Sequence, residues 1–497
     1  MESLGDTLWD VVICGTGLQQ SLLALALSRS GKKILHLDPN DFYGGAEAAL
    51  TLQEATAWVE RLDKSGSRSS SVFRSASITK SEDSPALSFS RAYSLALAPQ
   101  LIHSRSQLLN DLVSSRAYKQ VEFLAVGSFF IFQPPSEASE KPTLNRIPST
   151  REDVFLTTSI PAKAKRGLMK FLKFVLDYDV EPKRESWQPY TDMPLSEFLS
   201  KEFKMDTQLQ TYIITLTLSL DGNLSTKDGL AVIHRHLSSM GVFGPGFAAI
   251  YPKWGGISEI AQVSCRAGAV GGAVYMLGTG IESIDTTVAD QIQLQLTSGD
   301  TVKTRMLVKS SEVAVEESGV SRLIVIIGSP LKMLFEAVVE GQQKPAVAVV
   351  ALPSGSLTYT AGKTSPFPVY VFAHSSDTGE CPVGQSMLYL TTMTTPDAED
   401  VLGKALQSFL DAVGVQPSPD ILYQLYYERM AGTVDGQMEG SILSFPAASP
   451  SLAFDDLTLG PVREAWKRVL GDAADESAYM TFADREGIAD DDDDLYD

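Results

Sequence analysis

A strand, a glycine turn and an apolar helix open this chain, and together they limit the folds that it can adopt. Residues 10–17 read Asp-Val-Val-Ile-Cys-Gly-Thr-Gly, the beginning of the G-x-G-x-x-G motif that binds a dinucleotide. Gly15 and Gly17 are present, but Gln20 stands where the third glycine lets the helix pack closely against the strand. The sequence therefore predicts the scaffold of a dinucleotide-binding domain with a spoiled cofactor site.

Asp38 lies at the end of the second predicted strand, which covers residues 33–37. It follows Gly17 by 21 residues, which is where dinucleotide-binding domains place the acid that binds a ribose. Because Gln20 interrupts the motif, we interpret Gly15, Gly17 and Asp38 as a vestigial motif that was inherited with the fold. A flavin-dependent oxidoreductase is the alternative that the same residues leave open.

The pattern along the chain divides it into parts. Its 497 residues are enough for about three domains. We predict a large α/β domain in two pieces, 1–148 and 246–473, and a smaller helical domain over 149–245 between them. The serine-rich residues 64–86 predict a flexible surface insertion, and 474–497 predict a disordered acidic tail.

Charge and cysteine content exclude several classes of protein. A net charge of −20 argues against nucleic-acid binding, because phosphates require a basic surface. Cys14, Cys265 and Cys381 are too far apart for a disulfide framework or a zinc motif, and they favour a reducing compartment. We find no signal peptide, no apolar stretch that could span a bilayer and no C-terminal prenylation motif. These features predict a cytoplasmic protein.

No group of residues predicts catalysis or metal binding. His234 and His236 are two positions apart, so on a helix their side chains point in different directions. No carboxylate cluster completes a zinc site around them, and we interpret both as structural. The sequence has no G-x-S-x-G, C-x-x-C or P-loop motif, and we predict no catalytic residue, no metal and no cofactor.

Two other segments stand out. Tyr43-Gly44-Gly45 places an aromatic residue in a loop, as an interface anchor or as a packing residue in a plain turn. Residues 251–276 read YPKWGGISEIAQVSCRAGAVGGAVYM, in which Glu259 and Arg266 are two helical turns apart and share one face. Their spacing alone is more typical of a solvated charged face.

The two segments are collinear with conserved blocks of a known family. The stretch DVVICGTGLQQSLLALALSRSGKKILHLDPNDFYGGAEA and the stretch YPKWGGISEIAQVSCRAGAVGGAVYML resemble those of the Rab GDP dissociation inhibitor and Rab escort protein superfamily. The resemblance covers residues 8–472. The serine-rich insertion and the final SFPAASPSLAFDDLTLGPVREAWKRVL with its acidic tail make the chain more similar to escort proteins, in a compact form like that of fungi.

The resemblance implies an α/β fold with a large domain like that of FAD-dependent monooxygenases, Rossmann-type with mixed sheets, and a smaller all-helical domain. Carried over by position, the family's Rab contacts fall on Tyr43, Glu259, Arg266 and Met276. The pair Lys253-Trp254 departs from the hydrophobic-tyrosine pair usual in the family, which puts the preference among Rab proteins in doubt.

The helical domain of the family accepts an isoprenoid and, in escort proteins, docks the transferase. We expect Phe198 to contact the transferase. We expect the isoprenoid to contact four apolar residues: Leu172, Val175, Ile213 and Leu216. The alternative is that these four side chains belong to the hydrophobic core.

The implied function is that of a non-catalytic escort protein. It would bind GDP-bound Rab GTPases and present them to the α/β heterodimer of Rab geranylgeranyltransferase. It would then carry the geranylgeranylated Rab to a membrane, which it contacts transiently. The alternative within the family is a dissociation inhibitor that only recycles prenylated Rab proteins.

Overall fold

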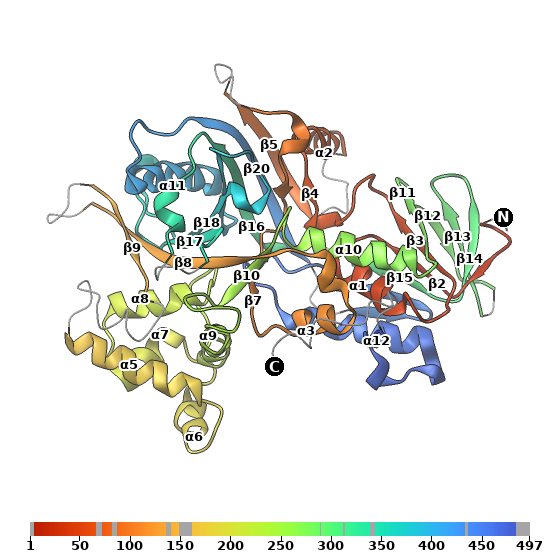
Figure 1. The fold of residues 1–497 in the computed structure, drawn as a ribbon, viewed down its shortest axis with the longest axis horizontal. Coiled ribbons are helices and arrows are strands. Elements are labelled where there is room, and N and C mark those ends of the chain that lie inside the picture. Colours follow the sequence, from red (N-terminus) through yellow and green to blue (C-terminus); the bar gives the residue numbers. More distant parts are fainter. Residues whose placement is uncertain are drawn as a thin grey trace, which may run out of the picture.

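The computed structural model combines two large sheets with a group of helices on one side (Figure 1). The structure describes residues 4–65, 72–81, 87–135, 141–148, 162–288, 290–311, 314–337, 343–432 and 436–483. None of the helices in these ranges is both long and apolar enough to cross a membrane.

The first sheet carries the glycine turn predicted from the sequence. Its strand order is β11-β3-β2-β15-β22-β21, and all neighbours are parallel except the last pair. The strands are β2 (Val11–Cys14), β3 (Ile34–Asp38), β11 (Val274–Leu277), β15 (Leu307–Ser310), β21 (Gln437–Glu439) and β22 (Ile442–Phe445). The strands β2 and β3 are apolar almost throughout because both faces of the sheet are covered.

One face of this sheet is covered by three helices and the other by a small sheet. The helices are α1 (Leu18–Leu27), α10 (Ile257–Val270) and α12 (Leu459–Leu470), with α3 (Gln107–Ser114) packed beside them. The small sheet has the order β1-β14-β13-β12 and consists of β1 (Leu8–Trp9), β12 (Ile281–Asp285), β13 (Ile292–Leu296) and β14 (Thr301–Thr304). In Figure 1, α10 lies alongside α1 with the strands behind them.

The second large sheet is mainly antiparallel and has the order β5-β20-β16-β19-β18-β17-β8-β10-β7, with β9 beside β8. Helix α11 (Ala398–Val413) covers one face. The strands are β5 (Phe73–Lys80), β7 (Ile102–His103), β8 (Phe123–Gln133), β9 (Thr143–Arg146), β10 (Ala249–Pro252), β16 (Ala314–Ile327), β17 (Val347–Leu352), β18 (Val369–Ser375), β19 (Ser386–Met393) and β20 (Ile421–Gly432). The short pair β4 (Ala49–Leu50) and β6 (Leu95–Ala96) stands apart.

The expectation of a flexible insertion over 64–86 is wrong for its central part. Residues 73–80 form β5, which pairs with β20. The ring of Phe73 packs edge-on against that of Trp58 of α2 (Leu52–Ser65), with ring centroids 5.1 Å apart. Burial of Phe73 and Ala76 gives this polar stretch the apolar contacts that order it. Residues 66–71 and 82–86 lie outside the described ranges.

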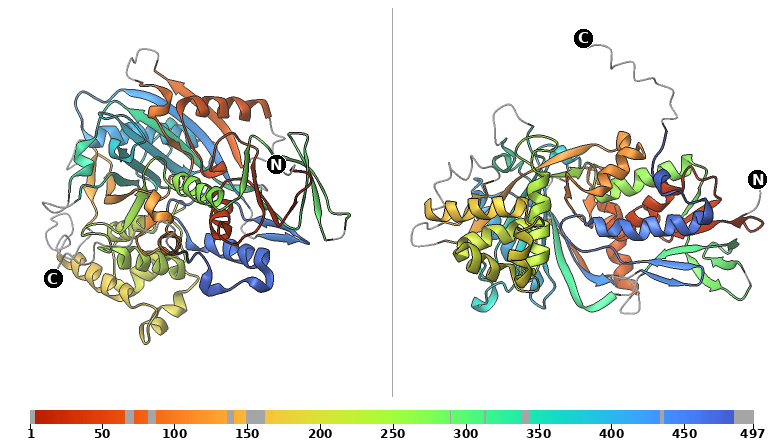
Figure 2. Two further views of the ribbon diagram at one scale, coloured as in Figure 1. Left: turned by 45° about the vertical axis from the view of Figure 1, so that its right-hand side comes forward. Right: turned by 90° about the horizontal axis from the view of Figure 1, so that it is seen from below.

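The described residues between the two parts of the sheet region form a group of helices, which Figure 2 shows gathered at one end of the molecule. They are α5 (Ala162–Leu176), α6 (Lys183–Trp187), α7 (Leu195–Phe203), α8 (Thr207–Leu216) and α9 (Thr226–Ser239). The side chains of Asp206 and Ser225 accept hydrogen bonds from the first turns of α8 and α9, which fixes where these helices begin. The domain boundaries at 148 and 245 stay a prediction.

The expectation of a disordered tail from residue 474 is wrong for its first ten residues. Met480 is buried, and the ring of Tyr479 packs edge-on against Trp466 of α12 with centroids 5.2 Å apart. The backbone N–H of Phe482 donates to the carbonyl of Ser114 at 3.1 Å. These apolar side chains attach the segment to α3 and α12, while residues 484–497 lie outside the described ranges.

Candidate functional site

The glycine turn after β2 is filled by a side chain of the protein itself. Gln20 is buried, and its amide lies against both glycines: a Cβ on Gly15 would be 3.3 Å from its Nε2, and a Cβ on Gly17 would be 3.1 Å from its Oε1. Gln20 also donates a hydrogen bond to the hydroxyl of Ser310. The space that a pyrophosphate occupies over such a turn is therefore taken by the carboxamide.

The N-terminus of α1, where a dinucleotide places its phosphates, already holds an anionic group. The carboxylate of Glu47 accepts a hydrogen bond from the backbone N–H of Leu18 at 2.7 Å. Burial raises the pKa of Glu47, whereas the bond from Leu18 and the charge of Arg429 oppose that rise.

Asp38 makes all its contacts within the protein. Its Oδ2 accepts from the backbone N–H and the hydroxyl of Thr16 at 2.7 and 2.6 Å, and its Oδ1 accepts from the backbone and side chain of Asn40 at 2.7 and 3.0 Å. These bonds give Asp38 a structural role. With Gln20 and Glu47 in place, the residues around the turn do not fit a dinucleotide.

This geometry predicts that the protein does not retain flavin. Protein that has been incubated with FAD and separated from free FAD by gel filtration should show no flavin absorbance. A flavoprotein treated in the same way serves as the positive control. A stoichiometric flavin signal in this protein would contradict the account of Gln20 and Glu47.

Of the four residues that the resemblance assigned to Rab contact, Tyr43, Glu259 and Arg266 lie on or beside α10, whereas Met276 lies on the edge strand β11 and packs against the core next to the small sheet. We call Tyr43, Glu259, Arg266 and Met276 the platform. Glu259 and Arg266 lie on α10, the first half-buried and the second exposed, and Met276 is half-buried on β11, next to β3. Tyr43, also half-buried, lies between these elements, since it interacts electrostatically with Cys265 of α10 and with Tyr275 of β11.

The environment of the platform perturbs two of its groups. Burial raises the pKa of Glu259, and the nearby Arg266 guanidinium opposes that rise. Burial also raises the pKa of Tyr43, and Cys265 and Asp38 add to the effect. The platform therefore combines an ion-forming pair with an aromatic ring and a thioether, the kinds of groups that anchor protein interfaces.

The vestigial turn holds the loop that carries Tyr43. The backbone N–H of Gly44 donates to the hydroxyl of Thr16 at 2.9 Å, and that hydroxyl in turn donates to Asp38. Gly44 has a φ of +100°, and a Cβ there would come within 2.8 Å of Ala48. The vestigial turn therefore holds in place the loop that carries Tyr43.

A second site is an apolar pocket of about 780 Å³ between the helical group and β8. Three of the four residues predicted to contact an isoprenoid line it: Leu172 of α5, and Ile213 and Leu216 of α8. The fourth, Val175, does not fit the prediction. It is fully buried in the hydrophobic core on the inner side of α5, so the core and not the pocket uses it.

The wall of this pocket also contains polar atoms that the sequence did not reveal. Among the described residues, neither the hydroxyl of Tyr212 nor Nδ1 of His236 has a hydrogen-bond partner, and both residues line the pocket. Burial lowers the pKa of His236 to about 4. As predicted for the i, i+2 pair, His234 points elsewhere, with its ring 5.4 Å from that of Tyr178.

Phe198 does not have the exposure that a partner contact requires. Its side chain is 1% exposed and packs among Phe174, Phe203 and Tyr190, with ring centroids 5.3–6.0 Å apart. The prediction that Phe198 contacts a transferase is therefore wrong for this conformation, because its ring belongs to the core of the helical group.

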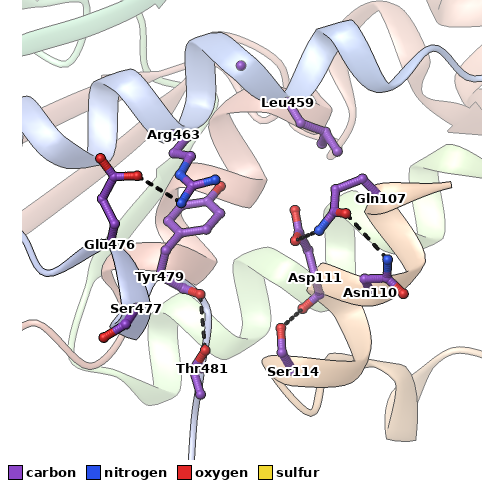
Figure 3. Close-up of a pocket in the computed structure, with 11 residues that line it drawn as sticks. Gln107, Asn110, Asp111, Ser114, Leu459, Arg463, Glu476, Ser477, Tyr479 and Thr481 are labelled. Carbon is purple, nitrogen blue, oxygen red and sulfur yellow. Dashed lines mark hydrogen bonds and ion pairs between the residues drawn. The ribbon is translucent and has the colours of Figure 1, made fainter.

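A smaller polar pocket of about 500 Å³ lies where α3, α12 and residues 476–481 meet (Figure 3). Arg463 forms an ion pair with Glu476 at 3.0 Å, and Gln107 donates to Asp111 at 2.9 Å. Burial raises the pKa of Asp111. The polar groups pair within each wall of the pocket, Arg463 with Glu476 on one side and Gln107 with Asp111 on the other, so the pocket marks the junction between α3 and the C-terminal segment.

Comparisons with known proteins identify the family and the fold. The model of the GDP dissociation inhibitor family matches residues 5–350, which is more than half of the 497 residues. A protein of Saccharomyces cerevisiae named "Rab proteins geranylgeranyltransferase component A" is 32% identical over 408 residues. That match covers 80% of this chain but only 64% of the yeast protein, less than two thirds of its length.

Solved structures confirm the predicted fold class. The crystal structure of Rab GDI from Plasmodium falciparum has a TM-score of 0.67 at 18% identity, covering 94% of this chain and 99% of that one. An oxidoreductase from Methanosarcina mazei has a TM-score of 0.58 at 12% identity, covering 92% and 99%. Likeness at these identities shows the fold alone, whereas the family model identifies the family: the chain belongs to the GDP dissociation inhibitor family.

Proposed function

We propose that this protein is a Rab escort protein. It binds GDP-bound, unprenylated Rab GTPases, presents them to Rab geranylgeranyltransferase and delivers the prenylated Rab to a membrane. The observation that carries the proposal is that one chain combines the platform with a separate apolar pocket of about 780 Å³. The name of the yeast relative, which describes a component of a Rab geranylgeranyltransferase, supports it.

The platform is the proposed contact with the Rab protein. Glu259 and Arg266 supply charges that fix the orientation of a partner, and Tyr43 and Met276 supply apolar area. The half-buried positions of Tyr43, Glu259 and Met276 limit the side-chain motion that binding would have to freeze.

The pocket is the proposed site for the geranylgeranyl group. Removing an apolar chain from water contributes about 0.8 kcal/mol for each buried CH₂, so a long isoprenoid needs a large apolar site. The volume of the pocket lies within the range of roughly 300–1,000 Å³ that is usual for small-ligand sites. Leu172, Ile213 and Leu216 are its proposed lipid contacts.

The proposed activity requires binding and no bond-making by this chain. The transferase, which we propose docks on the helical group, would carry out the prenylation. A protein that binds Rab while another protein catalyses prenylation would need a protein-binding surface and a lipid pocket, which are the two proposed sites.

A dissociation inhibitor is the second candidate, because the matching family model carries that name. Such a protein would bind prenylated Rab through the same two sites. It would differ from an escort protein in giving no support to the prenylation of new Rab.

The platform can be tested by removing its charges. Glu259→Ala and Arg266→Ala should each weaken the binding of GDP-loaded Rab by about 10-fold, equivalent to about 1.4 kcal/mol, because each removes a charge that would pair with the partner across the proposed contact. Isothermal titration or a pull-down with recombinant GDP-loaded Rab would measure this.

The exposed residues Glu399 and Lys404 of α11 offer matched controls. Glu399→Ala and Lys404→Ala remove the same charges away from the platform and should leave Rab binding unchanged. If the platform variants bind as tightly as the wild type, then the contact lies elsewhere.

A further inference from the structure

Trp254, which lies directly before α10, combines high exposure with an unusual backbone. Its side chain is 52% exposed, although tryptophan is among the residues that contribute most to interface affinity. Its φ is +74°, a left-handed conformation that bulky residues rarely adopt. Such conformations persist only where the surroundings impose them, and they cluster at functional positions.

Contacts on both sides impose this conformation. The backbone N–H of Trp254 donates to the carbonyl of Thr378 at 2.9 Å, and its own carbonyl accepts from the hydroxyl of Ser94 at 2.8 Å. The indole rests on Gly379, where a Cβ would come within 2.4 Å of the ring. The next residue, Gly255, sits so close to Ala49 that a Cβ would come within 2.4 Å of the alanine side chain.

A buried polar network fixes the segments that hold the indole. The carboxylate of Glu380, next to Gly379, accepts from the hydroxyl of Tyr251 at 2.7 Å and from that of Tyr389 at 3.1 Å. Its other partner is Nδ1 of His374 at 2.6 Å. All four side chains are almost completely buried, so the network joins β10, β18 and β19 beneath Trp254.

The position of Trp254 continues the platform. It precedes Glu259 by five residues, and Gly255 abuts Ala49, which follows the loop that carries Tyr43. The ammonium group of Lys253 lies 4.8 Å from the centre of the indole and forms an ion pair with Glu122 at 2.9 Å. An exposed ring held rigidly beside a cation is suited to a partner with an apolar patch bordered by a carboxylate.

We propose that Trp254, together with Lys253, is a further contact for the GDP-bound Rab GTPase and helps to determine which Rab proteins bind. This inference rests on the proposed function, since it names the same partner. It also gives a physical reason for the departure from the hydrophobic-tyrosine pair that the sequence showed at this position.

The test separates the ring from the backbone. Trp254→Gly removes the indole but adopts the left-handed φ without strain, so the loop should keep its shape. We expect this variant to bind recombinant unprenylated, GDP-loaded Rab at least about 10-fold more weakly than the wild type, as for a central aromatic anchor. Trp254→Tyr should lose less affinity, because it keeps an aromatic ring.

Two controls accompany this measurement. Leu457→Gly removes another exposed apolar side chain, 81% exposed, and should leave binding unchanged. Thermal unfolding should show that Trp254→Gly is still folded, with one cooperative transition well above the temperature of the binding measurement.

The outcomes distinguish this inference from the proposed function. If the wild type fails to bind GDP-loaded Rab, then the proposed function fails and this inference fails with it. If the wild type binds and Glu259→Ala weakens binding but Trp254→Gly does not, then only the inference about Trp254 is overturned. It is also overturned if Trp254→Gly binds Rab normally and loses binding of the transferase.

Discussion

Replacing Leu216 with aspartate should reduce the affinity for geranylgeranylated Rab on the order of 100-fold and leave the affinity for unprenylated Rab unchanged. Leu216 ends α8 and lines the apolar pocket while remaining partly exposed, so the variant can fold with its new charge near solvent. A lipid entering the pocket would have to strip water from the carboxylate or give up the contact with α8. Either consequence weakens the binding of the lipid, so only the geranylgeranylated form of Rab should lose affinity.

The measurement compares the two forms of one Rab protein by titration against each variant. Leu457→Asp makes the same chemical change at a well-exposed leucine far along the chain and serves as the matched control. Equal affinity of Leu216→Asp and the wild type for geranylgeranylated Rab would show that the lipid binds elsewhere.

The protein should lose stability between pH 6.5 and pH 4, and His36 should account for about 3 kcal/mol of that loss. His36 is fully buried on β3, and burial lowers its pKa from the ordinary value of 6.5 to about 4. Its Nε2 lies 2.6 Å from the carbonyl of Gly15, which can only accept, so Nε2 carries the proton of the neutral ring. Within the described residues Nδ1 has no partner, so a second proton would be buried without an acceptor.

The sign of the effect follows from linkage. Below pH 6.5 His36 is protonated in the unfolded chain, whereas in the folded protein it stays neutral until the pH falls to about 4. Stability is therefore complete above pH 6.5 and declines as the pH falls, by about 1.36 kcal/mol per pH unit. Asp38 and Glu47, whose pKa values are raised by burial, act in the opposite direction.

A His36→Gln variant isolates the histidine from those carboxyl groups. Its side-chain amide can donate to the Gly15 carbonyl but does not titrate in this range. Urea unfolding at pH 7 and pH 4.5 should show that the wild type loses about 2–3 kcal/mol more than the variant. Equal losses would contradict the assignment of His36 as a buried neutral ring.

Local patterns in the sequence predicted much of the large domain. The apolar runs around Gly15 and Gly17 predicted β2, α1 and β3, which the structure contains. These elements are specified by short-range signals: continuous apolar stretches and glycines at the turns.

Long-range contacts account for the errors. The polar residues 73–80 form a strand only because β20 and Trp58 are there to receive them. The end of the chain is ordered for the same reason, since Tyr479 packs on α12. The local composition of these two segments does not indicate which strand or helix each of them packs against.

For the pocket, the sequence predicted which helix positions are apolar but not which of them line the pocket. The resemblance and the apolar pattern of the helical segments selected Leu172, Val175 and Phe198, but neither tells a pocket wall from a core. Glu47 was missed because no motif marks it, and its role depends on a loop that brings it back to the N-terminus of α1. Family resemblance carried over the platform residues, and the place of one of them, Met276, depends on the pairing of β11 with β3.

The most direct test of the account is the geranylgeranylation of an unprenylated, GDP-loaded Rab protein by the catalytic α/β transferase. We predict that lipid transfer requires this protein and that Arg266→Ala lowers the rate at limiting protein concentration. A known escort protein in the same assay shows that the transferase is competent. If transfer proceeds with that control but not with this protein, the proposed escort function is contradicted, and tight binding of geranylgeranylated Rab would then identify a dissociation inhibitor.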